Sequence, residues 1–181
     1  CTRRDIQREI EAAGGAPHGP EGVLYPGHCR NLSEAERRSR IASGESFAMR
    51  LNLARALEET GRDLEWADRE RGLQKAQPEM LGDVVLVRKD IGCSYHLAVV
   101  VDDALQEVTR ITRGEDLFEA THIQRLLQAL LDLPTPEYHH HRLICDPDGR
   151  RLAKRDEAET LHSLRLRGVS ALDVRERLGF K

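Results

Sequence analysis

The chain has 181 residues, of which 39% are hydrophobic and 33% charged, a balance typical of a soluble globular protein that can bury a real core. Its formal net charge of −3 excludes a globally basic nucleic-acid binder, although a local basic patch could still contact RNA. No apolar run approaches the roughly 20 residues of a membrane-spanning helix, and no signal peptide is visible, so we expect no membrane partner.

The cysteines indicate a reducing compartment. There are four, Cys1, Cys29, Cys93 and Cys145, in a chain that is not small and shows no sign of secretion. Free thiols or metal ligands are therefore expected rather than disulfides, and the expected location is cytoplasmic. Because the chain starts at Cys1 and not at methionine, we expect it to be a fragment.

The first third of the chain alternates short helices with loops. Residues 2–12 carry one thin apolar stripe, which predicts a short amphipathic helix. Glycine and proline make residues 14–22 a loop by composition. Ser33 and Glu36 match a capping box, which predicts a helix over residues 34–42.

The middle of the chain reads as short strands. Alternating apolar residues predict a half-exposed strand at residues 47–51. Residues 53–63 are ambiguous and are compatible with a helical turn. Residues 64–82 contain enough glycine and proline to predict loops around short strands, and residues 84–87 predict a further strand.

Residues 97–101 support two interpretations. Three consecutive valines at 99–101 favour a strand, but the phase of the apolar residues also allows a buried helix, and periodicity alone does not decide. Strands are predicted at residues 108–112 and 141–145. Between them, the apolar face of residues 117–131 predicts the clearest helix of the chain.

The last part of the chain is polar. Residues 146–149 have the composition of a turn, and a basic segment, Arg150–Arg155, follows it. Alone, such a segment is a solvated loop or a clamp for phosphate. Residues 157–167 and 171–178 predict two small helices.

Two groups of residues have the composition of metal sites. Tyr25 and Cys29 flank a Pro-Gly turn, and with Cys1 they could supply part of a zinc site, with His28 as an alternative ligand. The other interpretation is two free thiols and a tyrosine packed under a loop. Three adjacent histidines, His139–His141, also resemble a metal tract, but on an extended chain they alternate between faces, so we favour a strand lead-in.

Tyr95 and Arg113 are candidates for binding a small acidic ligand. An arginine at a strand end can take a carboxylate in a bidentate contact, and a tyrosine hydroxyl can add one hydrogen bond. Taken singly, an ion pair of Arg113 with Glu115, Asp116 or Asp102 is the better interpretation.

Considered jointly, residues 83–155 resemble the second half of a class I glutamyl-tRNA synthetase catalytic core. The order and spacing of five phrases carry this resemblance: Asp83–Asp90, Tyr95–Asp103, Thr109–Asp116, Thr121–Gln124 and Gly149–Arg155. The resemblance implies an α/β fold, the Rossmann-type catalytic core of class I aminoacyl-tRNA synthetases, of which only the second half is present. It also resolves residues 95–105 as helix.

The two ends of the chain are similar to one branch of that family, the glutamyl-Q tRNA(Asp) synthetases. Their zinc ligands are Cys-x-Cys, a tyrosine, and a cysteine four residues later, a pattern that Cys1, Tyr25 and Cys29 match from its second cysteine onward. Only 26 residues follow Arg155, too few for the anticodon-binding domain of an ordinary glutamyl-tRNA synthetase. The resemblance therefore implies one zinc per chain within an α+β insertion.

The family resemblance also implies the chemistry. Members of this branch activate L-glutamate with ATP and Mg, and transfer it to queuosine in tRNA(Asp). Tyr95 and Arg113 fall on the glutamate-binding positions, and Lys154 falls on the lysine that contacts ATP and acts in catalysis. Arg151 and Ala153 depart from the family pattern of that loop, and the remaining half of the active site belongs to residues upstream.

We thus expect three parts: a zinc-binding insertion at 1–93, the second half of the catalytic domain at 94–145, and the ATP-contacting loop with small C-terminal helices at 146–181. The expected protein is a monomeric ligase. One alternative is the truncated catalytic domain of an ordinary glutamyl-tRNA synthetase. Another is a non-catalytic zinc- or RNA-binding module derived from a synthetase.

Overall fold

A computed structural model describes residues 18–19, 22–44, 46–61, 63–88, 92–145 and 160–179. The chain divides into two compact units, Cys1–His141 and Arg142–Lys181. The helix expected at residues 2–12, the proposed ligand Cys1, and the segment 146–155 with Lys154 lie outside the described residues.

The first described elements form a small hairpin. Strand β1 (His18–Gly19) pairs antiparallel with β2 (Gly22–Val23), so the prediction of a loop throughout residues 14–22 was wrong. Gly22 has φ of +110°, a conformation that favours glycine. Glycine- and proline-rich composition does not reveal that two short segments of such a stretch pair as strands.

Helix α2 (Glu34–Ala42) confirms the predicted capping box. The Ser33 amide donates to Glu36 Oε2 at 2.8 Å, and the Glu36 amide donates to Ser33 Oγ at 3.3 Å. Strand β3 (Ala48–Arg50) then pairs antiparallel with β6 (Val85–Arg88), which confirms both predicted strands. The register shifts between Met49 and Arg50, and Met49 remains 57% exposed.

Helix α3 (Leu53–Thr60) is longer than the single turn that the sequence suggested. Asn52 begins it, because its Oδ1 accepts from the Arg55 amide at 3.3 Å. The helix contributes Leu53, Ala56 and Leu57 to a hydrophobic core shared with α5. Packing on that core explains why an ambiguous local pattern becomes a helix.

The first unit contains a mixed four-stranded sheet. Its strands are β4 (Glu65–Asp68), β5 (Gly72–Lys75), β7 (Arg110–Gly114) and β8 (Glu137–His141), in the order β5-β4-β8-β7. β4 and β5 pair antiparallel, whereas β8 pairs parallel with both β4 and β7. A short 3-10 helix, η1 (Pro78–Met80), follows β5.

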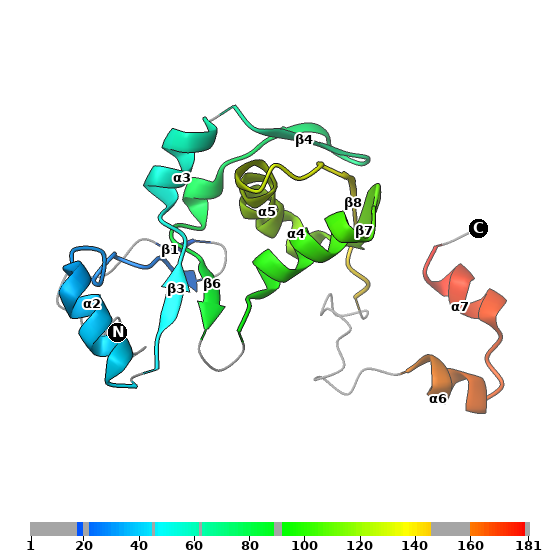
Figure 1. Ribbon diagram of the computed structural model, residues 1–181. Helices are drawn as coiled ribbons and strands as arrows, with labels where there is room; N and C mark the ends of the chain where they lie inside the picture. The colour runs from blue at the N-terminus through cyan, green and yellow to red at the C-terminus, as the bar shows by residue number, and fades with distance from the viewer. Residues whose placement is uncertain are drawn as a thin grey trace. The chain divides into compact units, whose positions relative to one another are not determined.

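Two helices flank the parallel strands (Figure 1). The interpretation of residues 95–105 as helix is confirmed by α4 (Tyr95–Leu105), which Ser94 caps through a 3.4 Å hydrogen bond from the Leu97 amide. A second short 3-10 helix, η2 (Glu115–Leu117), leads into α5 (Phe118–Leu130), which connects β7 to β8. Most of the apolar face predicted for this helix is buried, with Ile123 and Leu126 fully inaccessible, whereas Leu131 at its end is 44% exposed.

The strand predicted at residues 141–145 was placed too late in the chain. The observed strand β8 covers Glu137–His141, with Glu137 opposite Arg110 and His141 opposite Gly114 on β7. β7 itself begins two residues later than predicted. Tyr138 and His140 point into the core, at 0% and 2% exposure, and this burial rather than the apolar run after His141 decides where the strand lies.

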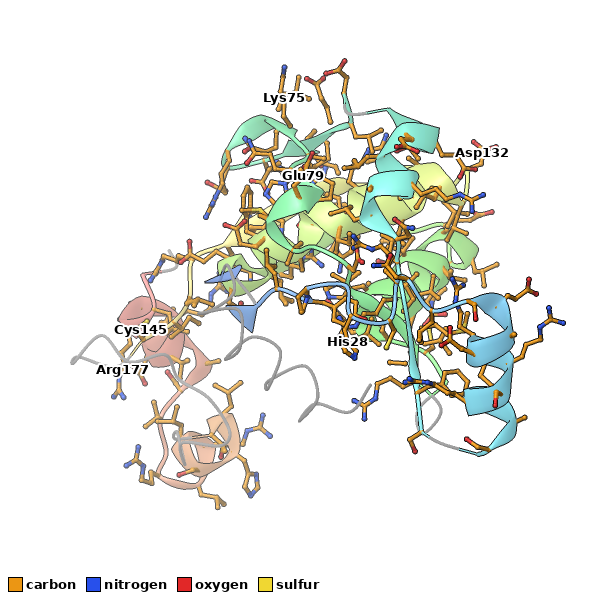
Figure 2. The ribbon with its side chains drawn as sticks, turned by 90° about the vertical axis from the view of Figure 1, so that its left-hand side faces the viewer. His28, Lys75, Glu79, Asp132, Cys145 and Arg177 are labelled. Carbon is orange, nitrogen blue, oxygen red and sulfur yellow. The ribbon has the colours of Figure 1, made fainter. Side chains whose placement is uncertain are left out.

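The second unit contains two short helices, α6 (Leu161–Leu166) and α7 (Ala171–Arg177), within the regions where the sequence predicted them. Arg142 donates a hydrogen bond to the Leu178 carbonyl within this unit. Figure 2 shows the side chains of both units, including the exposed thiol of Cys145 and, on the first unit, Lys75 and Asp132 on the surface. None of the helices described is long and apolar enough to cross a membrane.

Candidate functional site

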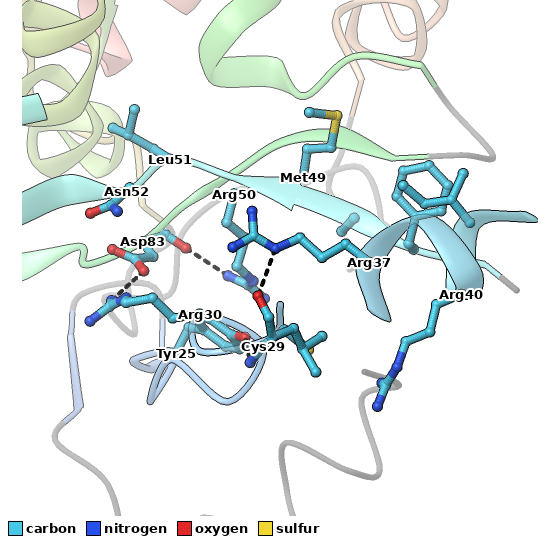
Figure 3. Close-up of a pocket in the computed structure, with 14 residues that line it drawn as sticks. Tyr25, Cys29, Arg30, Arg37, Arg40, Met49, Arg50, Leu51, Asn52 and Asp83 are labelled. Atoms are coloured by element: carbon cyan, nitrogen blue, oxygen red, sulfur yellow. Dashed lines mark hydrogen bonds and ion pairs between the residues drawn. The ribbon is translucent and has the colours of Figure 1, made fainter. Parts of the chain in front are cut away.

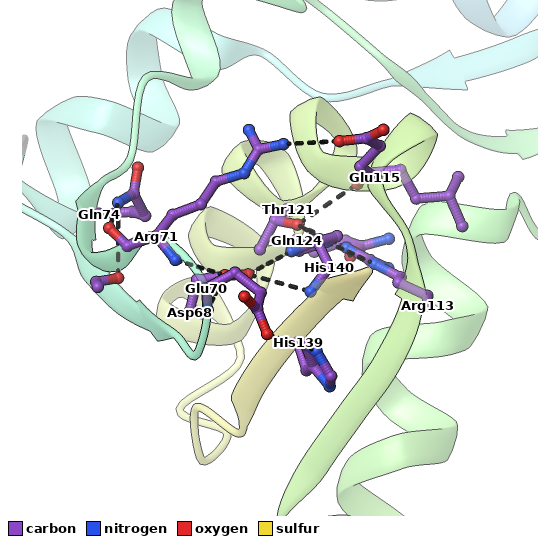
Figure 4. Close-up of polar contacts among 12 residues, drawn as sticks. Asp68, Glu70, Arg71, Gln74, Arg113, Glu115, Thr121, Gln124, His139 and His140 are labelled. Carbon is purple, nitrogen blue, oxygen red and sulfur yellow. Dashed lines mark hydrogen bonds and ion pairs between the residues drawn. The ribbon is translucent and has the colours of Figure 1, made fainter. Parts of the chain in front are cut away.

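Arg113 stands at the carboxyl end of β7 and is held by three neighbouring side chains (Figure 4). Its Nε donates to His140 Nε2 at 3.0 Å, and its Nη2 donates to Thr121 Oγ1 at 2.6 Å and to Gln124 Oε1 at 2.8 Å. The guanidinium carbon also lies 5.2 Å from the centre of the Tyr138 ring. The guanidinium plane is therefore fixed before any ligand binds.

The remaining donors of this cluster are buried and unpartnered. An arginine has five N–H donors, and the three contacts above use the one on Nε and both on Nη2. Arg113 Nη1 has no hydrogen-bond partner, and neither has Gln124 Nε2, although both atoms are buried. Buried donors without acceptors are costly, so two of them in one hydrogen-bonded cluster indicate a place for an anionic or strongly polar acceptor.

The geometry corrects two expectations about Arg113. Among the described residues, it forms no ion pair with Glu115, Asp116 or Asp102; instead, Arg71 pairs with Glu115 at 3.3 Å. The N–H donors of Nε and Nη2 are already used in hydrogen bonds to neighbouring side chains. A carboxylate would therefore accept from Nη1 alone, and not from two nitrogens as in a bidentate contact.

His140 connects Arg113 to the buried Asp68 of β4. Its Nδ1 lies 2.6 Å from Asp68 Oδ2, and Asp68 Oδ1 accepts from the Glu70 and Arg71 amides at 2.9 and 3.0 Å. Since Arg113 can only donate, His140 Nε2 must be its acceptor, which places the ring proton on Nδ1, directed at Asp68. All three side chains thus have complementary donor and acceptor roles.

Burial and these contacts set the charges of the pair. Burial lowers the pKa of His140, Asp68 opposes that effect, and the positive charges of Arg113 and Arg71 add to it, so the imidazole is neutral near pH 7. Burial alone would raise the pKa of Asp68, but hydrogen bonds from His140 and from the Glu70 and Arg71 amides hold it below its ordinary value. The neutral imidazole is the form that can accept from Arg113.

Tyr95 occupies the first position of α4, with half of its surface exposed. Its ring centre lies 5.9 Å from that of His96. Neither a hydrogen bond nor a ring contact joins Tyr95 to Arg113 among the described residues, so a shared ligand would have to bridge them. The role expected for Tyr95 stays a prediction.

Tyr25 and Cys29 lie together beside a pocket of about 410 Å³ (Figure 3). The Cys29 amide donates to the Tyr25 hydroxyl at 2.8 Å, and the guanidinium of Arg50 covers the tyrosine ring at 4.3 Å. Arg30 anchors this loop to the buried Asp83 through a 2.5 Å ion pair. The pocket is otherwise lined by Leu32, Arg37, Arg40, Ile41, Phe47, Ala48, Met49, Leu51 and Asn52.

The phenol oxygen and the cysteine of this turn are suitable as two adjacent zinc ligands. In the part of the chain that the structure describes, no three His, Cys, Asp or Glu side chains lie together as metal ligands. The proposed set differs from such a group, because it includes a tyrosine and because Cys1 lies outside the described residues. Cys29 is disulfide-bonded, so the expectation of free thiols or metal ligands rather than disulfides is wrong for this residue. A metal binds the thiolate, so a zinc site at Cys29 requires the reduced form.

Four residues of the Arg113 cluster were not predicted as site residues: Asp68, Thr121, Gln124 and His140. Thr121 and Gln124 belong to a phrase that carries the family resemblance, so a signal was present. His140 belongs to the histidine tract interpreted as a strand lead-in; it lies within β8 instead, although the predicted alternation of faces is confirmed. Asp68 had no sequence signal, since its partner lies 72 residues away.

Comparison with known proteins defines the class. The family described as tRNA synthetases class I (E and Q), catalytic domain, matches residues 3–176. The chain therefore belongs to this family of class I tRNA synthetases. Two features of the fold agree with that assignment. One is a mixed sheet in which α5 joins two parallel strands, and the other is a polar cluster at the carboxyl end of β7.

Two similar relatives share one name. The glutamyl-Q tRNA(Asp) synthetase of Rhodobacter capsulatus is 48% identical over 99% of this chain and 65% of its own length. The protein of the same name from Nocardia farcinica is 46% identical over 96% of this chain and 51% of its own length. The chain thus spans about half to two thirds of the length of these relatives.

A solved structure shows the same fold. The glutamate tRNA ligase of Elizabethkingia meningosepticum, crystallised in complex with its amino acid, superimposes with a TM-score of 0.64. It is 26% identical, and the similarity covers 86% of this chain and 31% of that one.

Proposed function

We propose that this chain forms the amino-acid-binding part of a glutamyl-Q tRNA(Asp) synthetase, which activates glutamate with ATP and Mg and transfers it to queuosine in tRNA(Asp). The observation that carries the proposal is the pair of buried, unpartnered donors on Arg113 and Gln124. The names of the most similar relatives support the choice of glutamate and of the tRNA. A cytoplasmic, monomeric enzyme is part of the same proposal.

The chemistry requires positioning more than it requires a reactive side chain. In adenylate formation, an oxygen of the glutamate α-carboxylate attacks the α-phosphorus of ATP, the bond to the bridging oxygen breaks, and pyrophosphate leaves with the electron pair. Arg113, immobilised by its three neighbours, would hold a carboxylate of glutamate, and Tyr95 would add a hydrogen bond. Lys154 would offset the charge that develops on the leaving pyrophosphate.

Glutamate-dependent exchange of pyrophosphate into ATP, measured on the full-length enzyme, tests activation. We expect exchange with glutamate, and we expect Lys154→Ala to slow it by about an order of magnitude or more. Absence of exchange in the wild type, or a Lys154→Ala rate equal to wild type, would support the non-catalytic module instead.

The transfer step separates this proposal from an ordinary glutamyl-tRNA synthetase. Two observations favour that alternative: the fold shared with the glutamate tRNA ligase of Elizabethkingia meningosepticum, and a 32% identical glutamate–tRNA ligase from Syntrophus aciditrophicus. Full-length enzyme should glutamylate tRNA(Asp) that carries queuosine and leave tRNA(Glu) unmodified. Glutamylation of tRNA(Glu) alone would decide for the alternative.

We further propose that Tyr25 and Cys29, together with Cys1, bind one zinc ion per chain. The 2.8 Å contact between the Tyr25 hydroxyl and the Cys29 amide supports this proposal, because it keeps two ligand types on one tight turn. The bound metal would supply structural crosslinking of the turn to the segment that contains Cys1.

Metal analysis of protein kept under reducing conditions should find about one zinc per chain. Tyr25→Phe, which retains the ring under Arg50, and Cys29→Ser should each lower that stoichiometry markedly. Cys93→Ser is the matched control, because Cys93 is a free, exposed thiol, and it should retain the metal. Full zinc content in Cys29→Ser would exclude this ligand set.

A further inference from the structure

The side chain of Arg113 depends on residues that no ligand needs to touch. Of its hydrogen-bond partners, Thr121 and Gln124 lie on α5, close to the site, but His140 lies on β8 and is backed by Asp68 on β4. His140 and Asp68 both have side chains that are fully inaccessible to solvent. They can therefore act on a ligand only through the side chains that they contact, of which Arg113 is the cationic one.

We propose that Asp68 and His140 are positioning residues for glutamate: Asp68 fixes the tautomer of His140, whose Nε2 then orients the guanidinium of Arg113. The proposal rests on the proposed function, since it assumes that Arg113 binds glutamate. Its geometric basis is the sequence of contacts Asp68 Oδ2 to His140 Nδ1 at 2.6 Å and His140 Nε2 to Arg113 Nε at 3.0 Å.

The two carboxylate oxygens of Asp68 accept hydrogen bonds from different donors, so each donated proton has one defined acceptor. Oδ1 accepts from the Glu70 and Arg71 amides, and Oδ2 faces His140. In Asp68→Asn, the side-chain oxygen should keep the two amide bonds, so its NH₂ group would face His140 Nδ1. The ring would then have to carry its proton on Nε2, directed at Arg113 Nε–H, where two donors oppose each other.

The environment of His140 allows this tautomer control. The charged groups that face it are Asp68, Arg113 and Arg71, and the Phe118 and Tyr138 rings pack against it, at 5.1 and 5.7 Å between ring centres. Thr121 Oγ1 lies 3.2 Å from Nε2, and it also accepts from Arg113 Nη2. Loss of the Nε2 acceptor would thus remove one of the three side-chain contacts that hold the arginine and disturb its contact with Thr121.

Two substitutions of His140 separate its two contacts. In His140→Gln, the side-chain oxygen can occupy the place of Nε2 and accept from Arg113, whereas the contact with Asp68 is lost. In His140→Asn, the shorter amide can still donate to Asp68, but Arg113 Nε has no acceptor. A positioning role predicts the larger defect for His140→Asn, whereas a purely structural role of the Asp68 contact predicts the larger defect for His140→Gln.

The test is pyrophosphate exchange with varied glutamate on full-length enzyme, with melting temperatures recorded for every variant. His140→Asn and Asp68→Asn should raise KM for glutamate about tenfold or more, with kcat and KM for ATP changed much less. His140→Gln should remain within about threefold of wild type. His139→Ala, whose side chain pairs instead with Glu70 at 3.0 Å, is the matched control and should behave as wild type.

A spectroscopic measurement tests the tautomer independently of activity. The ¹⁵N shifts of His140 should show the proton on Nδ1 in the wild type and on Nε2 in Asp68→Asn. Wild-type KM for glutamate in both His140→Asn and Asp68→Asn, or an unchanged tautomer in Asp68→Asn, would overturn the positioning role while the proposed function stands. An inactive wild type would overturn the proposed function itself.

Discussion

Replacing Arg113 with alanine should reduce kcat/KM for glutamate in pyrophosphate exchange by roughly two orders of magnitude, corresponding to a loss of about 2–3 kcal/mol of charge-assisted hydrogen bonding. The defect should appear mainly as a higher KM for glutamate, because the guanidinium is proposed to bind a carboxylate rather than to react. KM for ATP should change little.

Arg110→Ala is the matched control for this prediction. Arg110 lies three positions earlier on the same strand, and its side chain is 51% exposed in an ion pair with Glu137. Exposed pairs contribute little to stability, so we expect glutamate saturation close to wild type. Unchanged saturation by glutamate in Arg113→Ala would remove Arg113 from the binding site.

The largest loss of stability is expected for Trp66→Ala. Trp66 is 2% exposed and packs on Phe118 and His122, with ring centres 5.8 and 4.7 Å away. Truncating a buried tryptophan removes its transfer free energy and leaves a cavity, which together cost about 3–5 kcal/mol. Urea unfolding followed by circular dichroism measures this loss, since Trp66 is the only tryptophan and its fluorescence disappears with it.

Leu73→Ala provides the comparison. Leu73 lies on β5, beside β4, but 68% of its surface is exposed, and it should lose no more than about 0.5 kcal/mol. A Trp66→Ala variant as stable as Leu73→Ala would mean that the cluster of Trp66, Ala76, Phe118 and Tyr138 contributes little to the fold.

Much of the local structure followed from the sequence because its causes are local. The Ser33–Glu36 capping box and the apolar face of α5 depend on residues three or four positions apart, and both were predicted correctly. The α4 helix is a different case: three valines favoured a strand, and only the family resemblance indicated a helix. Its burial against α5 overrides the local propensity.

The errors concern features that depend on distant partners. The position of β8 is set by β7 and β4 on its two sides, which residues 137–145 alone do not reveal. In the same way, Arg113 was identified as a candidate, but its acceptor on His140 and the role of Asp68 required the folded sheet. The expected ion pair of Arg113 with Glu115 was wrong because the Glu115 carboxylate pairs instead with Arg71, which lies 44 residues earlier in the chain.

The order of the central sheet also has a consequence for synthesis of the protein. β8 is the last of its four strands along the chain, yet it lies between β4 and β7, which do not pair with each other. Ribosomes deliver the chain from its amino end, so Asp68 and Arg113 leave the exit tunnel well before the strand that joins them. The sheet can close, and Arg113 can reach its final orientation, only after Glu137–His141 has emerged.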